Sequence, residues 1–272
     1  MADQITKADA FQKLHESGCF VIPNPWDVGS AKILEGLGFA ALATTSAGYA
    51  RSTGVNDYEL TRDKVLAHIK DLSANTALPL SADLENGFGH TPEDCHQTIS
   101  LGAKAGLVGG SIEDFSGEPG VQYPIEQAKE RIVAAVEAAR AQPFPFVLTA
   151  RAENFFTGTP DLDDTIKRLQ AYQEAGADVL YAPGLKTIDD IKSVLAAVDR
   201  PINVLLGPQD GLRPVFELAA LGVRRVSVGA VFANVAMDAL IKAGEELLGP
   251  GTFEFLNNTN GSNRIADLMF NR

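Results

Sequence analysis

Residues 78–113, LPLSADLENGFGHTPEDCHQTISLGAKAGLVGGSIE, contain one complete strand–helix–strand unit. The runs Leu78–Asp83 and Gly106–Ile112 have the length of buried strands, and the segment between them has the pattern of a helix. Pro92 marks the start of that helix, where its missing backbone N–H costs little. Strands joined through a helix in this way pair in parallel by a right-handed crossover.

The same alternation of short strand-like runs and longer amphipathic runs continues on both sides of this unit. Gly176 and Gly222 lie where two of the expected helices end. The eight expected strands are Phe20–Asn24, Ala40–Thr45, Leu78–Asp83, Gly106–Ile112, Phe146–Ala150, Val179–Ala182, Ile202–Leu206 and Arg225–Gly229, and the clearest further helices are Arg62–Ser73, Ile125–Ala141, Leu162–Glu174 and Ile188–Ala197.

Eight parallel strands linked by helices are typical of a closed (β/α)8 barrel of the TIM type, and 272 residues suit one such barrel. An open doubly wound sheet is the second candidate, but no GxGxxG motif follows Phe20–Asn24. No linker, low-complexity tract or charge block divides the chain. We therefore expect residues 1–272 to form a single α/β barrel domain with a C-terminal helical tail.

The tail is expected to begin with a helix, Val231–Leu248, and to become looser after it. It contains enough apolar residues to pack against another surface. Composition does not decide whether that surface belongs to a partner subunit or to the same chain. The apolar residues are Phe253, Phe255, Leu256, Met269 and Phe270.

Composition limits the classes of partner. The net charge of −12 and the pI near 4.8 argue against nucleic acid, which requires clustered Lys and Arg. No run approaches the roughly 18 apolar residues of a membrane span, and the N-terminus has no apolar signal core. Cys19 and Cys95 are too few for a disulfide framework or a zinc knuckle. We expect a cytoplasmic protein without a nucleic-acid or membrane partner.

Acidic and polar residues gather where the expected strands end. In a parallel barrel this edge carries the functional loops. The residues at the strand ends are Thr45, Ser46, Ala47 and Gly48, with Asp57 further along the same loop; Asp83 and Glu85; Glu113 and Asp114; Arg151 and Glu153; Tyr181; and Asn203.

The carboxylates among these residues predict a metal site. Asp83 and Glu85 are two residues apart, so on a strand both side chains would point to the same side. Glu113 follows from the neighbouring strand, and bare carboxylates crowded together would repel one another. A divalent cation that prefers oxygen ligands removes this repulsion. Mg2+ suits a site with few carboxylates and several waters, and the absence of His and Cys at these ends excludes a usual zinc set.

Arg151 is expected to hold a substrate carboxylate, because its planar guanidinium binds carboxylates through two hydrogen bonds. The competing interpretation is that these acids are solvated loop residues or helix caps. The four histidines support no catalytic role: His15, His68 and His96 fall in helical or pre-strand segments, and His90 is expected on the surface. A Ser-His-Asp arrangement is not available from these strand ends.

The chain resembles the isocitrate lyase and phosphoenolpyruvate mutase superfamily over nearly its whole length. The resemblance implies a Mg2+-binding barrel whose eighth helix is exchanged with a neighbouring subunit, in a homodimer or homotetramer. The segments that carry it are PNPWDVGSAKILEGLGFAALATTSAG, GVNDYE, SADLENGFG, GGSIEDFSG, TARAENFF and LDDTIKRLQAYQEAGADVLYAPG.

The resemblance also implies roles for individual residues. Asp83 resembles the direct metal ligand, and three further carboxylates, Asp57, Glu85 and Glu113, resemble those that hold the metal's waters. The backbone N–H groups of Ser46 and Ala47, next to Thr45, resemble those that bind the substrate carboxylate. The full implied set is Asp57, Arg151 and Glu113 for catalysis; Thr45, Ser46, Ala47, Arg151 and Asn203 for substrate; and Asp83, Glu85, Asp57 and Glu113 for Mg2+, with Mn2+ as an alternative ion.

Two segments depart from the family pattern. Lyases of the family carry a KKCGH-like loop whose Cys acts as the acid, whereas residues 115–123 read FSGEPGVQY and contain no Cys, Lys or His. The phosphonate branch has a His after the sixth strand, where this chain has Pro183 and Gly184. These departures argue against isocitrate or methylisocitrate cleavage and against phosphonopyruvate chemistry.

The expected function is therefore that of a Mg2+-dependent lyase of this superfamily. It would cleave a C–C bond in a small 2-oxo or 2-hydroxy dicarboxylate, and the metal would stabilise the resulting enolate. Two alternatives stay open at this point: chemistry at a P–C bond, as a mutase or hydrolase, and a non-catalytic barrel that binds 2-oxo acids. The leaving group, the general acid and the number of subunits are not specified.

Overall fold

The unit at residues 78–113 forms the expected strand–helix–strand structure in the computed structural model, which describes residues 2–207 and 213–270. Strand β3 is Leu80–Asp83, helix α5 is Pro92–Lys104 and strand β4 is Gly109–Glu113. Pro92 is the first helical residue, as predicted, and Thr91 caps the helix in a reciprocal pair with Asp94. β3 and β4 pair in parallel.

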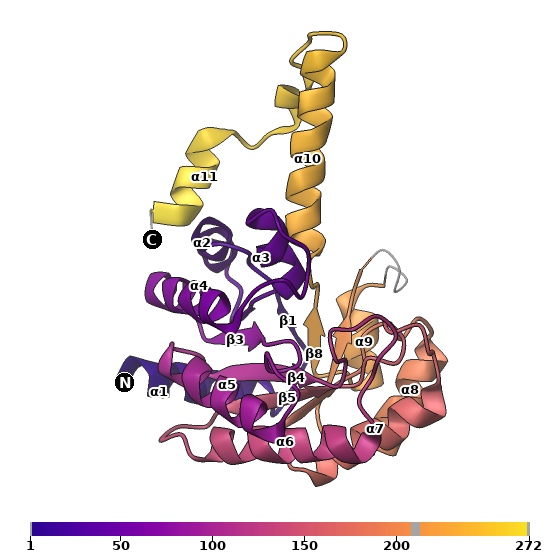
Figure 1. Cartoon of the computed structure of the whole chain (residues 1–272). Helices are drawn as coiled ribbons and strands as arrows, with labels where there is room; N and C mark the ends of the chain where they lie inside the picture. Colours follow the sequence, from indigo (N-terminus) through magenta and orange to yellow (C-terminus); the bar gives the residue numbers. More distant parts are fainter. Residues whose placement is uncertain (1, 208–212, 271–272) are drawn as a thin grey trace.

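The remaining elements repeat this unit around a barrel (Figure 1). Each strand overlaps its predicted range, and most strands are shorter than predicted; β4 and β5 extend one residue further, to Glu113 and Arg151. The strands are β1 Phe20–Ile22, β2 Leu42–Ala43, β5 Val147–Arg151, β6 Val179–Tyr181, β7 Ile202–Leu205 and β8 Arg225–Ser227; the helices are α1 Ala2–Leu14, α2 Val28–Gly36, α3 Ser46–Ser52, α4 Arg62–Asn75, α6 Ile125–Arg140, α7 Leu162–Glu174, α8 Ile188–Ala197, α9 Val215–Leu221, α10 Val231–Leu248, the 3-10 helix η1 Glu254–Asn258 and α11 Gly261–Phe270.

The sheet is a nearly closed barrel, so the predicted (β/α)8 class is confirmed. All pairs are parallel in the order β1-β8-β7-β6-β5-β4-β3-β2. The ladder ends at β1 and β2, where the Ala43 N–H donates to the Pro23 carbonyl (3.1 Å). Asn24 strengthens this seam: its amide donates to the carbonyls of Ala43 and Thr44, and its oxygen accepts from the N–H groups of residues 228 and 229.

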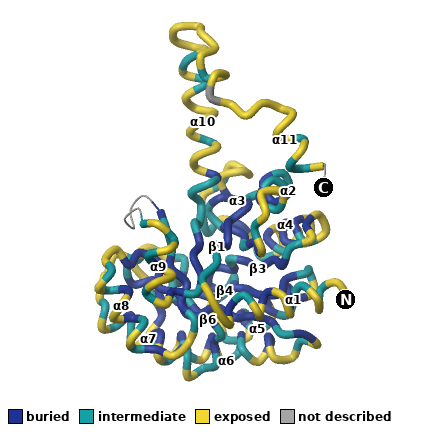
Figure 2. Tube along the Cα trace, turned by 180° about the vertical axis from the view of Figure 1, so that it is seen from behind, coloured by how far each residue is buried: buried dark blue, intermediate teal, exposed yellow. Residues whose placement is uncertain are grey.

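Helix α1, for which the sequence analysis made no prediction, lies against the amino-terminal end of the barrel. Phe11 is fully buried there and packs edge-on against His15 and Phe20. A Cβ at Gly109 would lie 2.7 Å from the Phe11 ring, so this glycine lets α1 approach β4. In Figure 2 the strands are mostly buried and the outer helix faces are exposed.

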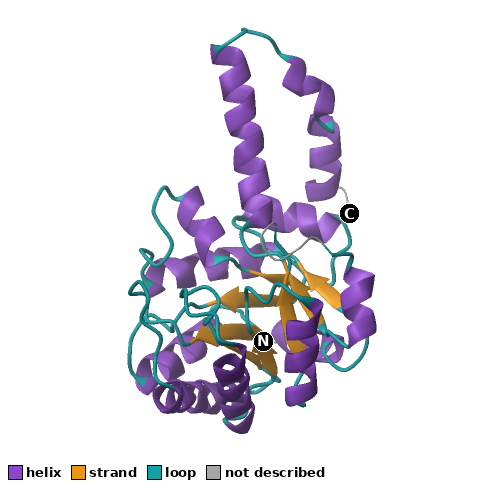
Figure 3. Ribbon diagram, turned by 90° about the vertical axis from the view of Figure 1, so that its right-hand side faces the viewer, coloured by secondary structure: helices purple, strands orange, loops and turns teal. Residues whose placement is uncertain are grey.

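Helix α10 projects away from the barrel instead of packing on it (Figures 1 and 3). The chain then turns and returns through α11, which lies beside α2 (Figure 1). A Cβ at Gly36 would lie 2.3 Å from the Leu268 carbonyl oxygen, so this glycine lets α11 approach α2. The tail therefore packs on its own chain through α11, whereas much of α10 and η1 is exposed. None of the helices within the described ranges combines the length and hydropathy that a membrane span requires.

Two buried histidines predict how stability depends on pH. Burial lowers the pKa of His15 to about 3 and that of His68 to about 4, so both are neutral in the fold at pH 7. In the unfolded chain each takes up a proton below pH 6.5, so stability falls as the pH drops from about 6.5 towards 4. His68→Gln should remove part of this loss, on the order of 1–2 kcal/mol between pH 7 and 5. Urea unfolding of both proteins at the two pH values measures it; identical pH slopes would contradict the prediction.

Candidate active site

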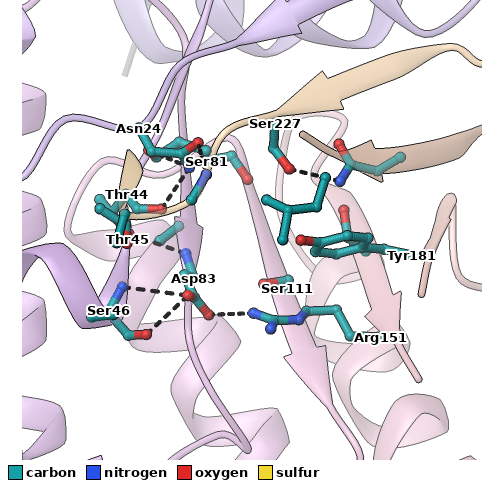
Figure 4. Close-up of a pocket in the computed structure, with 18 of the residues that line it drawn as sticks. Asn24, Thr44, Thr45, Ser46, Ser81, Asp83, Ser111, Arg151, Tyr181 and Ser227 are labelled. Carbon is teal, nitrogen blue, oxygen red and sulfur yellow. Dashed lines mark hydrogen bonds and ion pairs between the residues drawn. The ribbon is translucent and has the colours of Figure 1, made fainter. Parts of the chain in front are cut away.

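A cavity of about 440 Å³ opens at the carboxyl ends of the strands (Figure 4). It lies where the sequence placed the site, and seven of the nine predicted residues line it. Those seven are Thr45, Ser46, Ala47, Asp57, Asp83, Arg151 and Asn203.

Asp83, the last residue of β3, lies between Ser46 and the guanidinium of Arg151 (Figure 4). Its Oδ2 accepts from the Ser46 hydroxyl (3.0 Å) and the Ser46 N–H (3.3 Å). Its Oδ1 accepts from Nη1 of Arg151 (2.8 Å). The Thr44 hydroxyl accepts from the Asp83 N–H (3.0 Å) and fixes this strand end against β2.

Arg151, the last residue of β5, is bound by three carboxylates. Nη1 lies 2.8 Å from Asp83 and 3.1 Å from Glu113, and Nε donates to Glu153 at 2.8 Å. The guanidinium also lies 5.2 Å from the centre of the Tyr181 ring. Nη2 donates to no other residue of the described chain, so this nitrogen is available to a ligand.

Glu113 lies behind Arg151 and does not line the cavity. Its side chain is almost fully buried, and the Tyr58 hydroxyl donates a short hydrogen bond to it. Burial raises the pKa of Glu113, and the charge of Arg151 opposes that rise. Tyr58 has a φ of 64°, a left-handed conformation that is strained for a tyrosine. Tyr58 therefore has a strained backbone, and its hydroxyl contacts Glu113 of the site.

Two further carboxylates have oxygens without a hydrogen-bond donor. Asp57 Oδ1 and Glu85 Oε1 are both buried, and neither accepts a hydrogen bond from the part of the chain that the structure describes. Burial, and then the negative charge of Asp83, raise the pKa of Asp57. Burial, followed by the charges of Asp83 and Asp57, raises the pKa of Glu85 to about 8. These acids therefore lie close enough to oppose one another's ionisation.

The argument that placed Asp83 and Glu85 on the same side of one strand was wrong. β3 ends at Asp83, and Glu85 has a φ of 49°, so the two-residue strand repeat no longer applies. The Glu85 side chain lines a neighbouring cavity of about 570 Å³ together with Arg62 and His90. Within residues 2–207 and 213–270, no group of three or more His, Cys, Asp or Glu side chains is arranged to hold a metal by itself.

The residues present nevertheless fit a hard divalent cation. Mg2+ keeps several waters and needs only one or two protein carboxylates together with substrate oxygens. Asp83 faces the cavity, and the unpaired oxygens of Asp57 and Glu85 are suited to accept from metal-bound waters. A cation there would also offset the repulsion that raises the pKa values of the two acids.

The start of helix α3 supplies backbone donors. Thr45 is the N-cap, and its hydroxyl accepts from the Gly48 N–H (3.2 Å). Ser46 and Ala47 are therefore the first two helical residues, whose N–H groups have no acceptor within the helix. Both residues line the cavity; the Ser46 N–H donates to Asp83, and the Ala47 N–H donates to no residue of the described chain and is left for a carboxylate there.

The chain matches a known family over most of its length. The family model described as phosphoenolpyruvate phosphomutase matches residues 11–248. The chain belongs to this family. A solved structure of a Burkholderia cenocepacia J2315 protein is 52% identical to this chain, with a TM-score of 0.96, and the match covers 99% of this chain and 98% of that one. That protein is described as a lyase or mutase without an assigned reaction.

Two curated relatives add to the comparison. An uncharacterized protein of Mycobacterium tuberculosis (strain ATCC 25618 / H37Rv) is 32% identical over 225 residues, 82% of each protein. The oxaloacetate decarboxylase of Pseudomonas putida (strain GB-1) is 28% identical over 243 residues, 86% of this chain and 81% of that protein. The expected superfamily is confirmed, as is the expectation of an enzyme among its lyases.

The loop 115–123, which departs from the KKCGH pattern of the family's lyases, is anchored at both ends. Arg168 Nη1 donates to Asp114 Oδ2 (3.1 Å) before the loop and to the Tyr123 carbonyl (2.7 Å) at its end. Between them, the Ser116 N–H donates to the Val121 carbonyl (3.0 Å). The loop thus has fixed ends beside the cavity, and Phe115 lines the cavity wall.

The sequence analysis did not assign roles to Glu153, Tyr58 or Arg225 at this site. Glu153 had been noted at a strand end without a role; it follows Arg151 by two residues and accepts from its Nε. Tyr58 follows Asp57 directly in the sequence, but its hydroxyl contacts Glu113 at the end of β4. Arg225 is the charged first residue of the buried strand β8, and this position was the signal in the sequence that could have identified it. Asn203 lines the cavity, but its amide is engaged by Ser227 and Arg225.

Proposed function

We propose that the protein is a divalent-metal-dependent lyase that cleaves a C–C bond in a small 2-oxo or 2-hydroxy dicarboxylate. Mg2+ is the proposed ion, with Mn2+ as an alternative. The observation that carries the proposal is one cavity in which Asp83 and the unpaired oxygen of Asp57 lie opposite a free Arg151 nitrogen. Such a site binds a cation and a carboxylate side by side.

The chain's own residues would bind and orient the substrate. The Ala47 N–H would donate to its carboxylate, the Ser46 N–H would be shared between that carboxylate and Asp83, and Nη2 of Arg151 would bind it from the other side. Glu153 holds the plane of the guanidinium through Nε. When bound, the cation would neutralise the negative charge that develops on the substrate's carbonyl oxygen as the bond to C3 breaks.

The relatives support a C–C lyase without specifying its substrate. The P. putida relative is named an oxaloacetate decarboxylase, and decarboxylation is one form of the proposed cleavage. Chemistry at a P–C bond is the second candidate, because the matching family model is that of a phosphomutase. A barrel that binds 2-oxo acids without turnover is the third.

One experiment separates these three. The protein is incubated with Mg2+ and a panel of 2-oxo acids, 2-hydroxy acids and phosphonates in D2O, and the products are followed by 1H and 31P NMR. Consumption of a carboxylic acid that EDTA abolishes is the expected result. Consumption of phosphonates alone would assign P–C chemistry. Binding with neither turnover nor exchange of C3 protons would leave only the binder.

The loop 115–123 should become protected when substrate binds. Gly117 and Gly120 have φ values of 88° and 75°, which give the loop backbone freedom, while Arg168 fixes its ends. We expect proteolytic cleavage within the loop to slow at least about threefold with Mg2+ plus pyruvate or 2-oxoglutarate, because a closed loop excludes water from an enolate. Mg2+ alone is the control. Cleavage that is indifferent to both would mean that the loop does not close.

We also propose that α10 mediates a homodimer or homotetramer in the cytoplasm. Leu240 is 74% and Leu248 92% exposed, and Ile241, Phe253 and Leu256 are exposed beside them. An apolar helix that projects from its own barrel suits exchange with a neighbouring subunit. Leu240→Glu should shift the mass measured by light scattering towards the monomer, and Lys242→Gln, on the same helix, should not. An unchanged mass for Leu240→Glu would contradict the proposal.

A further inference from the structure

The interior of the barrel below the Asp83–Arg151 level is unusually polar. Ser81 and Thr149 precede Asp83 and Arg151 by two residues, so they lie on the same strand faces one layer deeper. Both line the cavity, as does Ser227 of β8. TIM-type barrels normally fill this layer with branched apolar side chains. The cavity therefore continues downwards into a polar floor.

Arg225 lies at this floor, and the groups of the described chain that bind it are all neutral. Nε donates to Asn203 Oδ1 (2.9 Å) and Nη2 to the Thr149 hydroxyl (2.9 Å). Nη1 lies 3.3 Å from Nε2 of His15, whose Nδ1 is bonded to the Phe11 carbonyl. His15 Nε2 is thus the acceptor in this contact, and His15 carries no charge.

No carboxylate of the described chain lies within salt-bridge distance of Arg225. The residue is 5% exposed, and a buried guanidinium without a counter-ion is strongly disfavoured. Arg151, by comparison, is bound by three carboxylates one layer above. Arg225 has five N–H groups and three such partners, so donor capacity is left over.

The cavity reaches this guanidinium. Arg225 is among the residues that line it, together with Ile22 and Leu205, which flank Ser227 on the neighbouring strands β1 and β7. Open space beside a buried, uncompensated cation must hold water or an anion, because buried polar groups need partners. The apolar walls contributed by Ile22 and Leu205 limit the hydration of this space and favour a group that carries the missing charge.

We propose that the floor of the cavity is a second anion site, in which Arg225 binds a carboxylate or an oxyanion of similar size. The hydroxyl of Ser227 is the second donor, since it also lines the cavity. This site is separate from the Arg151 level and requires no metal. The carboxylate belongs either to a free small anion or to the deeper end of a diacid whose other end binds Arg151.

The test uses full-length protein in EDTA, with sodium formate as the probe and sodium chloride at equal ionic strength as the reference. Formate should raise the melting temperature saturably in wild type. Arg225→Met should weaken the apparent formate affinity at least about tenfold. Arg224→Met is the matched control, because it removes the same charge from the adjacent residue, whose guanidinium binds the Gly18 carbonyl at the surface. It should respond like wild type.

A measurement on wild type keeps the proposal testable if Arg225→Met does not fold. The Nε–H resonance of Arg225, assigned by its loss in Arg225→Lys, should shift saturably with formate. An unmoved resonance, or an equal formate response in folded Arg225→Met, would overturn the site. Malonate and succinate distinguish the two sources. If either diacid binds at least tenfold more tightly than formate, and Arg225→Met removes this advantage, the ligand is a diacid. If the diacids bind no more tightly than formate, the ligand is a free small anion.

Discussion

Asp83→Ala should reduce turnover by roughly 10³-fold or more, the loss of about 4 kcal/mol of transition-state stabilisation. Asp83 is the predicted site acid whose carboxylate both faces the cavity and contacts Arg151. Without it, a cation would have only Asp57 and Glu85, whose unpaired oxygens suit contacts through water. Calorimetric titration with Mg2+ and the NMR assay measure the effect, and the affinity for Mg2+ should fall together with turnover.

The same substitution should leave the fold intact. The substitution removes the hydrogen bonds of Asp83 to Ser46 and Arg151. It also removes the negative charge that raises the pKa values of Asp57 and Glu85, so it relieves repulsion between the carboxylates. The melting temperature in metal-free buffer should therefore stay near or above that of wild type. Asp83→Asn keeps the size and the acceptor oxygen but loses the charge, and it should be equally inactive. Full turnover with unchanged Mg2+ affinity in either variant would remove the metal site from this face.

The barrel could be predicted from the sequence because its determinants are local. Strand-like runs, the N-terminal Pro92 and the terminating residues Gly176 and Gly222 each specify one boundary. Both glycines have the left-handed φ expected after a helix, 99° and 102°. Neighbouring parallel strands then bring their ends together without further information, which is why Asp83 and Arg151 were placed correctly.

The parts that could not be predicted depend on backbone turns and on tertiary packing. Glu85 was assigned to the wrong side because its left-handed φ follows a strand that ends two residues earlier. The direction of α10 depends on which surface its apolar residues pack against. The periodicity of Val231–Leu248 predicts the helix but not that surface. Arg225 pairs with groups more than 20 residues away, so only the folded barrel shows that it has no counter-ion among the described residues.

The electrostatics of the site follow from an excess of acid over base. Arg151 is close to Asp83, Glu113 and Glu153, and one guanidinium cannot neutralise three carboxylates. Burial raises the pKa values of Glu113 and Glu153, because their negative charge is costly inside the barrel. A cation near Asp83 would offset this negative charge, and the excess of acid is therefore a physical reason to expect one.

Arg151→Lys should raise KM and lower kcat together, with a loss on the order of 2–4 kcal/mol in kcat/KM. A lysine ammonium can replace Nη1 between Asp83 and Glu113, but it cannot also reach Glu153 as Nε does. Nη2, the nitrogen left for the substrate, disappears as well. The substrate would therefore lose a directed donor in the ground state and in the transition state.

Steady-state kinetics of Arg151→Lys against Arg140→Lys make the comparison. Arg140 also holds a carboxylate, Asp178, and two carbonyls, but it does so at the protein surface, far from the strand ends that form the cavity. Arg140→Lys should keep the wild-type kcat and KM, because it removes the same fork without touching the substrate. If Arg151→Lys also behaved like wild type, Arg151 would be only a structural partner of Glu153, and the carboxylate of the substrate would have to be held by the α3 N–H groups alone.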